Sequence, residues 1–152
     1  MNITFDQILK KFRYPESVVS ENDSWHTLLR MEQLTFGSLI LITKDSKNVN
    51  FSMLDDKEQL DMFKAIKKIE EFGYKELNCE KINFLALMML DPIVHFHILP
   101  RYSQEKIHNN ITYCDTGFPG PPNLGYKINL ESKEFLELVE YVKNGLPEIL
   151  FI

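Results

Sequence analysis

The segment Ile93–Leu99 restricts the fold more than any other part of the sequence. It reads Ile-Val-His-Phe-His-Ile-Leu, and successive side chains of a β-strand point to opposite faces of the sheet. The pattern predicts a strand with its Val, Phe and second Ile side chains toward a core and with His95 and His97 on the other face. Pro100 follows directly and is expected to end the strand, because proline has no N–H for a ladder hydrogen bond.

Other segments show helical periodicity. Apolar residues recur every three or four positions over residues 56–72, where Asp55 or Asp56 can cap a helix and Gly73 can end it. Two further helices are expected, over Ile3–Phe12 and over Leu130–Lys143. The inward positions of the last helix would be Phe135, Leu138, Val139 and Val142.

Four more strands are expected, over Trp25–Met31, Ser38–Thr43, Phe51–Met53 and Ile82–Leu90. The last is almost wholly apolar, which predicts burial on both faces and places Met88 and Met89 in the core. The segment 116–125 holds three prolines and three glycines and is expected to be a loop that covers a pocket or braces the C-terminal helix. This order of elements favours an α+β fold with a mainly antiparallel sheet, as one domain over residues 1–152.

Charge and apolar content exclude several functional classes. Seventeen Lys and Arg against 22 Asp and Glu give a net charge of -5, so the basic surface of a nucleic-acid-binding domain is not expected. The longest apolar run, Phe84–Leu90, is too short to span a bilayer, and the first residues lack the features of a secretory signal. Cys79 and Cys114 form no C-x-x-C motif and are expected to be buried thiols in a reducing compartment, which predicts a cytoplasmic protein.

Two imidazoles on one strand face allow three interpretations. They lie about 6.6 Å apart along a strand, which suits a tetrahedral group such as phosphate held between them. The same spacing suits two ligands of one metal, with Asp91, His108 or Asp115 as a third, but no partner at a fixed spacing supports this and no metal is expected. The third interpretation is a pair of histidines on a solvated face.

The histidines stand in the string Asp91-Pro92-Ile93-Val94-His95-Phe96-His97-Ile98-Leu99-Pro100-Arg101-Tyr102. This string resembles the signature of the histidine triad superfamily of nucleotide hydrolases and transferases, His-φ-His-φ-His-φ-φ followed by Pro-Arg, where φ is apolar. Upstream, Leu34–Lys44 resembles the family strand Pro-Gly-His-Leu-Leu-Val-Ile-Pro-Lys, and Phe51–Phe72 resembles its long central helix. The likeness spans roughly residues 24–103 and implies a histidine-triad-like fold with a long central helix and a C-terminal helix.

The register of this likeness assigns a role to each position. His97 precedes φ-φ-Pro-Arg as the last family histidine does, so His95 matches the middle histidine, which in the family attacks the α-phosphorus of a nucleotide. Ile93 then replaces the first histidine. In the other register His97 would be the nucleophile and Leu99 the vacant third position. Neutral imidazole is a nucleophile near pH 7 when one ring nitrogen donates to a backbone carbonyl and the other presents its lone pair.

Three further residues are candidate contacts to substrate. The segment 88–92, Met-Met-Leu-Asp-Pro, occupies the place of a phosphate-binding Gly-Gln-Ser/Thr stretch and is similar to a bacterial branch of the family. Asn83 lies about where the family has an amide near the phosphates, or is a strand-end amide bonded to backbone. Asp91 shares the face of His95, or is a turn residue. Ile93 is assigned to the substrate site by its position in the motif.

The likeness implies a nucleotide-binding hydrolase or nucleotidyl transferase that acts at the α-phosphorus of a nucleoside phosphate ester, anhydride or phosphoramidate. His95 and His97 would be catalytic, through a nucleotidyl-histidine intermediate and without a cofactor, and Glu32, beside Arg30, is a weaker candidate for the ribose hydroxyls. The alternative is a nucleotide-binding protein with little or no turnover, because the first histidine is lost. The partner would be a nucleotide or nucleotide conjugate, not a nucleic acid or a membrane, and the family implies a homodimer.

Overall fold

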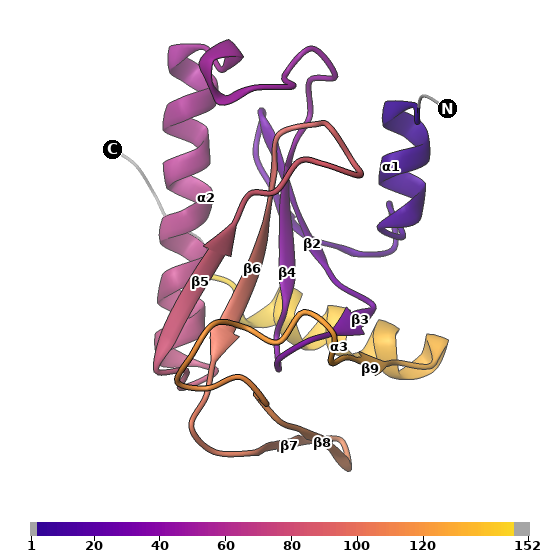
Figure 1. Cartoon of the computed structure of the whole chain (residues 1–152), viewed down its shortest axis with the longest axis vertical. Coiled ribbons are helices and arrows are strands. Elements are labelled where there is room, and N and C mark those ends of the chain that lie inside the picture. Colours follow the sequence, from indigo (N-terminus) through magenta and orange to yellow (C-terminus); the bar gives the residue numbers. More distant parts are fainter. Residues whose placement is uncertain (1–2, 148–152) are drawn as a thin grey trace.

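Residues 3–147 are described by a computed structural model, shown in Figure 1. Five antiparallel strands form the central sheet in the order β1-β2-β4-β6-β5. Their bounds are Val18–Glu21 for β1, Trp25–Leu29 for β2, Leu39–Thr43 for β4, Lys81–Leu85 for β5 and His95–Arg101 for β6. The expected α+β fold with a mainly antiparallel sheet is confirmed. Of the domain expected over residues 1–152, positions 1–2 and 148–152 lie outside the described residues.

Three helices and two short strand pairs complete the described part of the chain. The helices are α1 (Phe5–Lys11), α2 (Asp56–Lys75) and α3 (Ser132–Gly145), with a 3-10 turn over Phe51–Met53. Strand β3 (Glu32–Gln33) pairs with β9 (Ile128–Asn129), and β7 (Lys106–His108) pairs with β8 (Ile111–Tyr113). Within residues 3–147, no helix is both long enough and apolar enough to cross a membrane.

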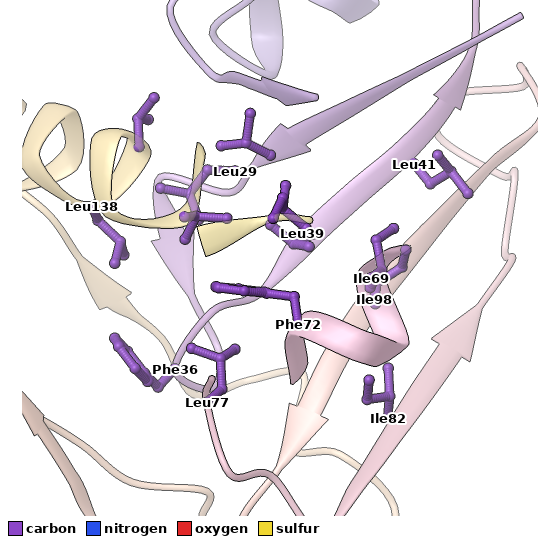
Figure 2. Packing of buried hydrophobic residues seen from close by; sticks show 14 of the residues in the cluster. Leu29, Phe36, Leu39, Leu41, Ile69, Phe72, Leu77, Ile82, Ile98 and Leu138 are labelled. Carbon is purple, nitrogen blue, oxygen red and sulfur yellow. The ribbon is translucent and has the colours of Figure 1, made fainter. Parts of the chain in front are cut away.

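The main core lies between one face of the sheet and the helices α2 and α3. Alternate strand residues such as Leu39, Leu41 and Ile98 pack in one cluster with Ile69 and Phe72 of α2 (Figure 2). The α3 positions expected to face inward are all buried in the same cluster: Phe135, Leu138, Val139 and Val142. This packing fixes which face of the sheet is left for other elements.

The opposite face of the sheet is covered in part by α1. Ile8 of this helix packs in a second cluster with Ile40 and Ile42 of β4, and Figure 1 shows α1 and α2 on opposite sides of the sheet. His97 and His95 of β6 lie directly across from these two β4 residues. Since directly opposed residues of paired strands share a face, both histidines lie on the α1 face, as the alternation predicts.

Helix α2 begins as the sequence predicts but continues further. The Asp55 carboxylate accepts from the N–H of Glu58, and the Glu58 carboxylate accepts from the N–H of Asp55, which is a complete capping box. The expected end at Gly73 is wrong, because the helix continues to Lys75. A Cβ at Gly73 would lie 2.7 Å from Cδ1 of Ile82, so the glycine allows α2 to approach β5 closely.

The strand expected over Phe51–Met53 and the expected end of the histidine strand before Pro100 are both wrong. Phe51–Met53 forms a 3-10 turn instead of a strand, and the ring of its first residue packs 5.6 Å from the ring of Phe96 on the sheet. Strand β6 continues through Pro100, which pairs with Ile82 of β5. The pairing of β6 with β4 ends at Ile98, so Pro100 lies past the region where β6 has two neighbours and its missing N–H interrupts no ladder on that side.

The strand expected over Ile82–Leu90 ends at Leu85, and the residues after it form a loop. Met88 has a φ of 51°, a left-handed conformation that strands do not contain. The expected burial of Met89 is wrong, because this residue is 83% exposed and Leu90 is 85% exposed. The loop reaches from β5 toward α1 (Figure 1) and presents apolar side chains to solvent.

Candidate active site

A cavity of about 290 Å³ opens on the α1 face of the sheet, beside the two histidines of β6. The sheet contributes Ile40, His95 and His97 to its lining. The other lining residues are Lys11, Phe12 and Arg13 at the end of α1, Arg30, Met31 and Glu32 after β2, and Leu87, Met88, Met89, Leu90 and Asp91 after β5. Segments far apart in the sequence therefore converge on the two histidines.

His95 is held in one tautomer by the backbone. Its Nδ1 lies 2.7 Å from the carbonyl oxygen of Ile93. A carbonyl oxygen only accepts hydrogen bonds, so Nδ1 carries the ring proton and donates it. Burial lowers the pKa of His95 below its ordinary value and outweighs the opposing effects of Ile93 and Asp91, so the ring is neutral near pH 7. Nε2 therefore presents a lone pair, which is the form of imidazole that attacks an electrophile.

His97 is held in the opposite tautomer by Arg30. Nη1 of Arg30 lies 2.8 Å from Nδ1 of His97. A guanidinium has N–H donors and no acceptor, so Nδ1 of His97 accepts and the ring proton is on Nε2. Burial and then the positive charge of Arg30 lower the pKa of His97 to about 4. His97 is therefore a neutral ring near pH 7 that can donate a hydrogen bond from Nε2.

The two rings differ in what they offer to a ligand. Their centroids are 5.0 Å apart and their planes meet edge to face at 79°. The ring of Phe12 lies 5.8 Å from that of His95 and limits the cavity on the side of α1. A phosphoryl group at the two histidines can be attacked by Nε2 of His95, while Nε2–H of His97 hydrogen-bonds to its oxygens.

The charged residues of the cavity favour an anion. Three cationic side chains and two carboxylates line it. Lys11 donates to both oxygens of Asp91, at 3.0 and 2.8 Å, which neutralises this pair. Glu32 lies 3.8 Å from Arg30 and is about half exposed, so it screens that guanidinium only weakly. The net positive charge beside the histidines suits a phosphate group.

Asp91 and Ile93, both expected to contact substrate, support the site in different ways. Asp91 lines the cavity and ties the loop after β5 to the end of α1 through Lys11. The side chain of Ile93 is buried in the second cluster with Ile8, and among the described residues it is not part of the cavity lining. Its backbone carbonyl fixes the tautomer of His95 instead.

Asn83 is placed away from the cavity. Its side-chain oxygen accepts a hydrogen bond from Nη1 of Arg101 at 2.7 Å. The same guanidinium donates to both carboxylate oxygens of Asp115, at 2.6 and 3.0 Å, and to the carbonyl of Gly120 at 2.9 Å. The loop 116–125 is thus fastened to the end of β6 and, within the described residues, lines no part of the cavity. The structure does not bring Asn83 together with the histidines.

The three residues considered as a third metal ligand are engaged in other contacts. Asp91 and Asp115 are each paired with a basic side chain, and the ring of His108 packs 4.4 Å from that of Tyr141. Across residues 3–147, no group of three or more His, Cys, Asp or Glu side chains is arranged to hold a metal ion. The cavity is therefore best described by its two histidines and its cationic side chains.

Two basic residues of the cavity carry no sequence signal that assigns them to it. Arg30 contacts His97 across 67 positions, and Lys11 contacts Asp91 across 80 positions. Contacts of this separation depend on the strand order and on the packing of α1, which local patterns do not specify. Glu32, the weaker candidate for a ribose contact, does line the cavity.

Comparison with known proteins shows which known fold this chain has. No protein-family model and no curated protein matches the sequence. Among solved structures, a histidine triad protein from Sinorhizobium meliloti 1021 aligns with a TM-score of 0.72 at 18% identity, over 95% of this chain and 98% of that one. A histidine triad protein from Marinobacter aquaeolei VT8 aligns with a TM-score of 0.70 at 18% identity, over 90% of this chain and 93% of that one.

A third similar structure is the diadenosine triphosphate hydrolase of Plasmodium falciparum, with a TM-score of 0.61 at 14% identity, over 90% of this chain and 92% of that one. The chain therefore has the fold of the histidine triad proteins, and this expectation from the sequence is confirmed. At these identities the likeness concerns the fold, and the activity must be argued from the residues of the cavity.

Proposed function

We propose that this chain is a nucleotide hydrolase or nucleotidyl transferase in which His95 attacks the α-phosphorus of a nucleotide. The observation that carries the proposal is the pair of opposite tautomers in one cationic cavity, with a lone pair on Nε2 of His95 and a hydrogen on Nε2 of His97. The fold supports it, since one similar structure is that of a diadenosine triphosphate hydrolase.

The reaction consists of two displacements at phosphorus. Nε2 of His95 forms a bond to the α-phosphorus as the bond to the leaving group breaks, and the leaving group takes that electron pair. The ring becomes a nucleotidyl-imidazolium. Water or another acceptor then attacks phosphorus, the P–N pair returns to Nε2, and the proton of the acceptor goes to solvent. With water the product is a nucleoside monophosphate.

The tautomers favour His95 over His97 as the nucleophile. An attack by Nε2 of His97 would need its proton on Nδ1, where Arg30 donates a hydrogen bond and holds a positive charge. The donor role suits His97 better, because a fixed N–H stabilises charge that develops on the phosphoryl oxygens. Ile93 would then stand in place of the first histidine of the family motif and serve His95 through its carbonyl.

We further infer a homodimer from two exposed features near each other. Within residues 3–147, strand β5 ends the sheet and has one strand neighbour, β6. The helix α2 packs against β5 at Gly73 and carries two exposed apolar residues, Leu60 and Phe63, which are 57% and 64% exposed. An open strand edge and exposed apolar residues on the neighbouring helix are typical of a site for pairing with a second copy. Sedimentation velocity at micromolar concentration measures the mass of the assembly directly.

The test of the activity uses three nucleoside 5′-phosphate derivatives: an anhydride, an aryl ester and a phosphoramidate. The chain is expected to release nucleoside monophosphate from at least one of them. A rapid quench into alkaline denaturant, followed by peptide mass spectrometry, should place the mass of one nucleotidyl group on His95, because a phosphorus–nitrogen bond of this kind is labile in acid.

The outcomes separate the two candidate functions. Turnover with an adduct on His95 supports the proposal. Nucleotide binding by calorimetry without release or adduct for any of the three compounds would mean a binding protein, and an adduct on His97 alone would mean that the two roles are exchanged. The matched variant His97→Asn keeps His95 intact and should still form the adduct.

A further inference from the structure

Arg30 is fixed in place by its surroundings and not by a buried carboxylate. Besides its bond to His97, its Nε donates to the backbone carbonyl of Glu32 at 3.2 Å. The buried side chain of Gln33 donates to the carbonyl of Arg30 at 2.7 Å and holds the backbone there. The guanidinium is thus positioned against His97 before any ligand binds.

This contact decides what His97 can do in a reaction. With Nδ1 occupied by the Arg30 N–H, the ring is neutral and has one proton, on Nε2. It can donate a hydrogen bond from Nε2, but the loss of that proton would leave an anionic ring, which does not form near pH 7. To act as an acid, His97 would first have to take up a proton on Nδ1, at the position that Arg30 occupies.

No other residue of the cavity is suited to the role of acid. The residues that line it within the described chain include no Ser, Thr, Tyr or Cys. The ammonium of Lys11 donates to both carboxylate oxygens of Asp91, and loss of a proton would leave that carboxylate without its cationic partner. His95 uses its own proton for the carbonyl of Ile93 and its lone pair for the attack. The leaving group therefore receives no proton from the cavity as its bond breaks.

We propose, on the basis of the proposed function, that Arg30 is a positioning residue that keeps His97 a hydrogen-bond donor. The site then transfers nucleotidyl groups from phosphoanhydrides in preference to phosphoramidates and alkyl esters. In an anhydride, the P–O bond breaks with its electron pair on a phosphate oxygen, which is stable without a proton. An amine or an alkoxide needs a proton as it leaves, and general acid catalysis of that step contributes about 10²- to 10⁴-fold.

The first test measures the tautomer and titration of His97 without any substrate. The charged and titratable groups that act on His97 are Arg30, His95, Asp91 and Lys11. In ¹⁵N-labelled protein, long-range ¹H–¹⁵N spectra should show Nδ1 of His97 unprotonated and Nε2 protonated, with no titration between pH 5.5 and 8. In Arg30→Met the pKa of His97 should rise and both tautomers should appear.

Two matched variants separate the contact from the charge. Arg30→Lys keeps a cation that can donate to Nδ1 and should restore the tautomer in part. Arg13→Met removes a cation that lines the same cavity but has no bond to His97, so the His97 spectrum should stay as in the wild type. A mixed tautomer in the wild type, or an unchanged His97 in Arg30→Met, would overturn the positioning role.

The second test measures leaving-group dependence in a series of nucleoside 5′-aryl phosphates. The wild type should show a steep fall of kcat/KM as the pKa of the phenol rises, and the anhydride should exceed the phosphoramidate by about 10²-fold or more. Arg30→Met should flatten that slope at pH values below the raised pKa of His97. A shallow slope in the wild type would sink the substrate preference, and absence of turnover with every compound would instead sink the proposed function while the spectra of His97 still stand.

Discussion

Two largely buried guanidinium groups lie at opposite ends of β6 and are neutralised very differently: Arg30 contacts His97 near the start of the strand, and Arg101 is its last residue. Arg101 donates to both oxygens of Asp115, whose side chain is 1% exposed, and its remaining bonds go to Asn83 and to the Gly120 carbonyl. Arg30 donates to a neutral imidazole and a backbone carbonyl, and the carboxylate nearest to it among the described residues, on Glu32, is 3.8 Å away.

The difference shows how one residue type can hold a fold together or serve a ligand. At Arg101 the fixed carboxylate of Asp115 balances the buried positive charge, so this ion pair is neutral without any ligand. The Glu32 carboxylate near Arg30 is about half exposed and also forms an ion pair with Lys127 at 3.1 Å. An anion bound in the adjoining cavity would balance the positive charge of Arg30. Variants at the histidine end of β6 should therefore change activity, and variants at Arg101, at the other end of β6, should change stability.

The largest expected effect is on activity, at the histidine end of β6 beside the cavity. His95→Asn should lower kcat by about 10³-fold or more, because deletion of a nucleophile costs up to about 10⁶ in kcat. The asparagine amide can still donate to the carbonyl of Ile93, so the free energy of unfolding should change by less than about 1 kcal/mol. Single-turnover kinetics and urea unfolding measure the two quantities, and nucleotide Kd by calorimetry should change little.

The matched control for this variant is His97→Asn. It removes a hydrogen-bond donor to the phosphate, an effect of about 10²- to 10³-fold in kcat, and leaves the nucleophile in place. If His97→Asn abolished turnover while His95→Asn kept most of it, the roles of the two histidines would have to be exchanged. Loss of folding in both would remove the distinction between the two ends of β6.

The second largest expected effect is on stability, at the Arg101 end of β6. Arg101→Met should lower the free energy of unfolding by about 3–5 kcal/mol, because the carboxylate of Asp115 stays buried without its partner. It should leave the tautomers of the cavity histidines unchanged. Urea unfolding checks this as a shift of the midpoint at constant slope. The double variant Arg101→Met with Asp115→Asn should recover part of the loss, and a full loss in the double variant would mean that the charge is not the cause.

A smaller expected effect is the pH dependence of the stability that Arg101→Met loses. Burial raises the pKa of Asp115, but the hydrogen bonds from Arg101, Tyr102 and Gly117 outweigh it and hold the pKa below its ordinary value. The pair therefore stabilises the wild type above the unfolded pKa of about 3.9, and this contribution is lost as the pH falls through the lower folded pKa. Without Arg101 the effect of burial dominates and the pKa of Asp115 rises. Protonation of Asp115 then reduces the destabilisation of the variant.

The difference in stability between wild type and Arg101→Met should accordingly shrink as the pH falls from 7 to 4. A pKa difference of one unit corresponds to about 1.4 kcal/mol, so a decrease of at least about 1 kcal/mol is expected. Urea midpoints at four pH values give the result. A difference that stays constant with pH would show that lost packing of the arginine stem, and not the carboxylate, causes the destabilisation.

The sequence predicted the elements whose pattern is local. The alternation in Ile93–Leu99 gives the correct faces for the histidines, and Asp55, one of the two caps expected from the sequence, is the N-cap of α2. The β7–β8 hairpin also has a local signal in the pair Asn109-Asn110, because asparagine tolerates the positive φ that both residues of this two-residue turn adopt. That signal was available in the sequence and no strand was expected there.

The other parts that were missed depend on contacts between distant segments. The apolar run after Leu85 has the composition of a buried strand, but Asp91 is held by Lys11 of α1 and the run becomes the wall of a cavity. Arg30 has no pattern around it that predicts a contact with His97, because that contact follows from the order of the strands. Composition alone does not distinguish an apolar segment in a core from one that lines a site.

The smallest predicted effect concerns Ile93, whose backbone contacts His95 and whose side chain belongs to the buried second cluster. Its carbonyl serves His95, and its side chain packs under α1. Ile93→Val keeps the carbonyl and removes one methylene from a buried cluster, so the free energy of unfolding should fall by about 0.5–1.5 kcal/mol. The barrier of the reaction should change by less than about 0.4 kcal/mol, which is roughly twofold in kcat. Urea unfolding and steady-state kinetics on the best substrate measure both. A fall in kcat of tenfold or more, with the expected stability, would show that the side chain shapes the substrate site, and the assignment of Ile93 to the fold would then be wrong.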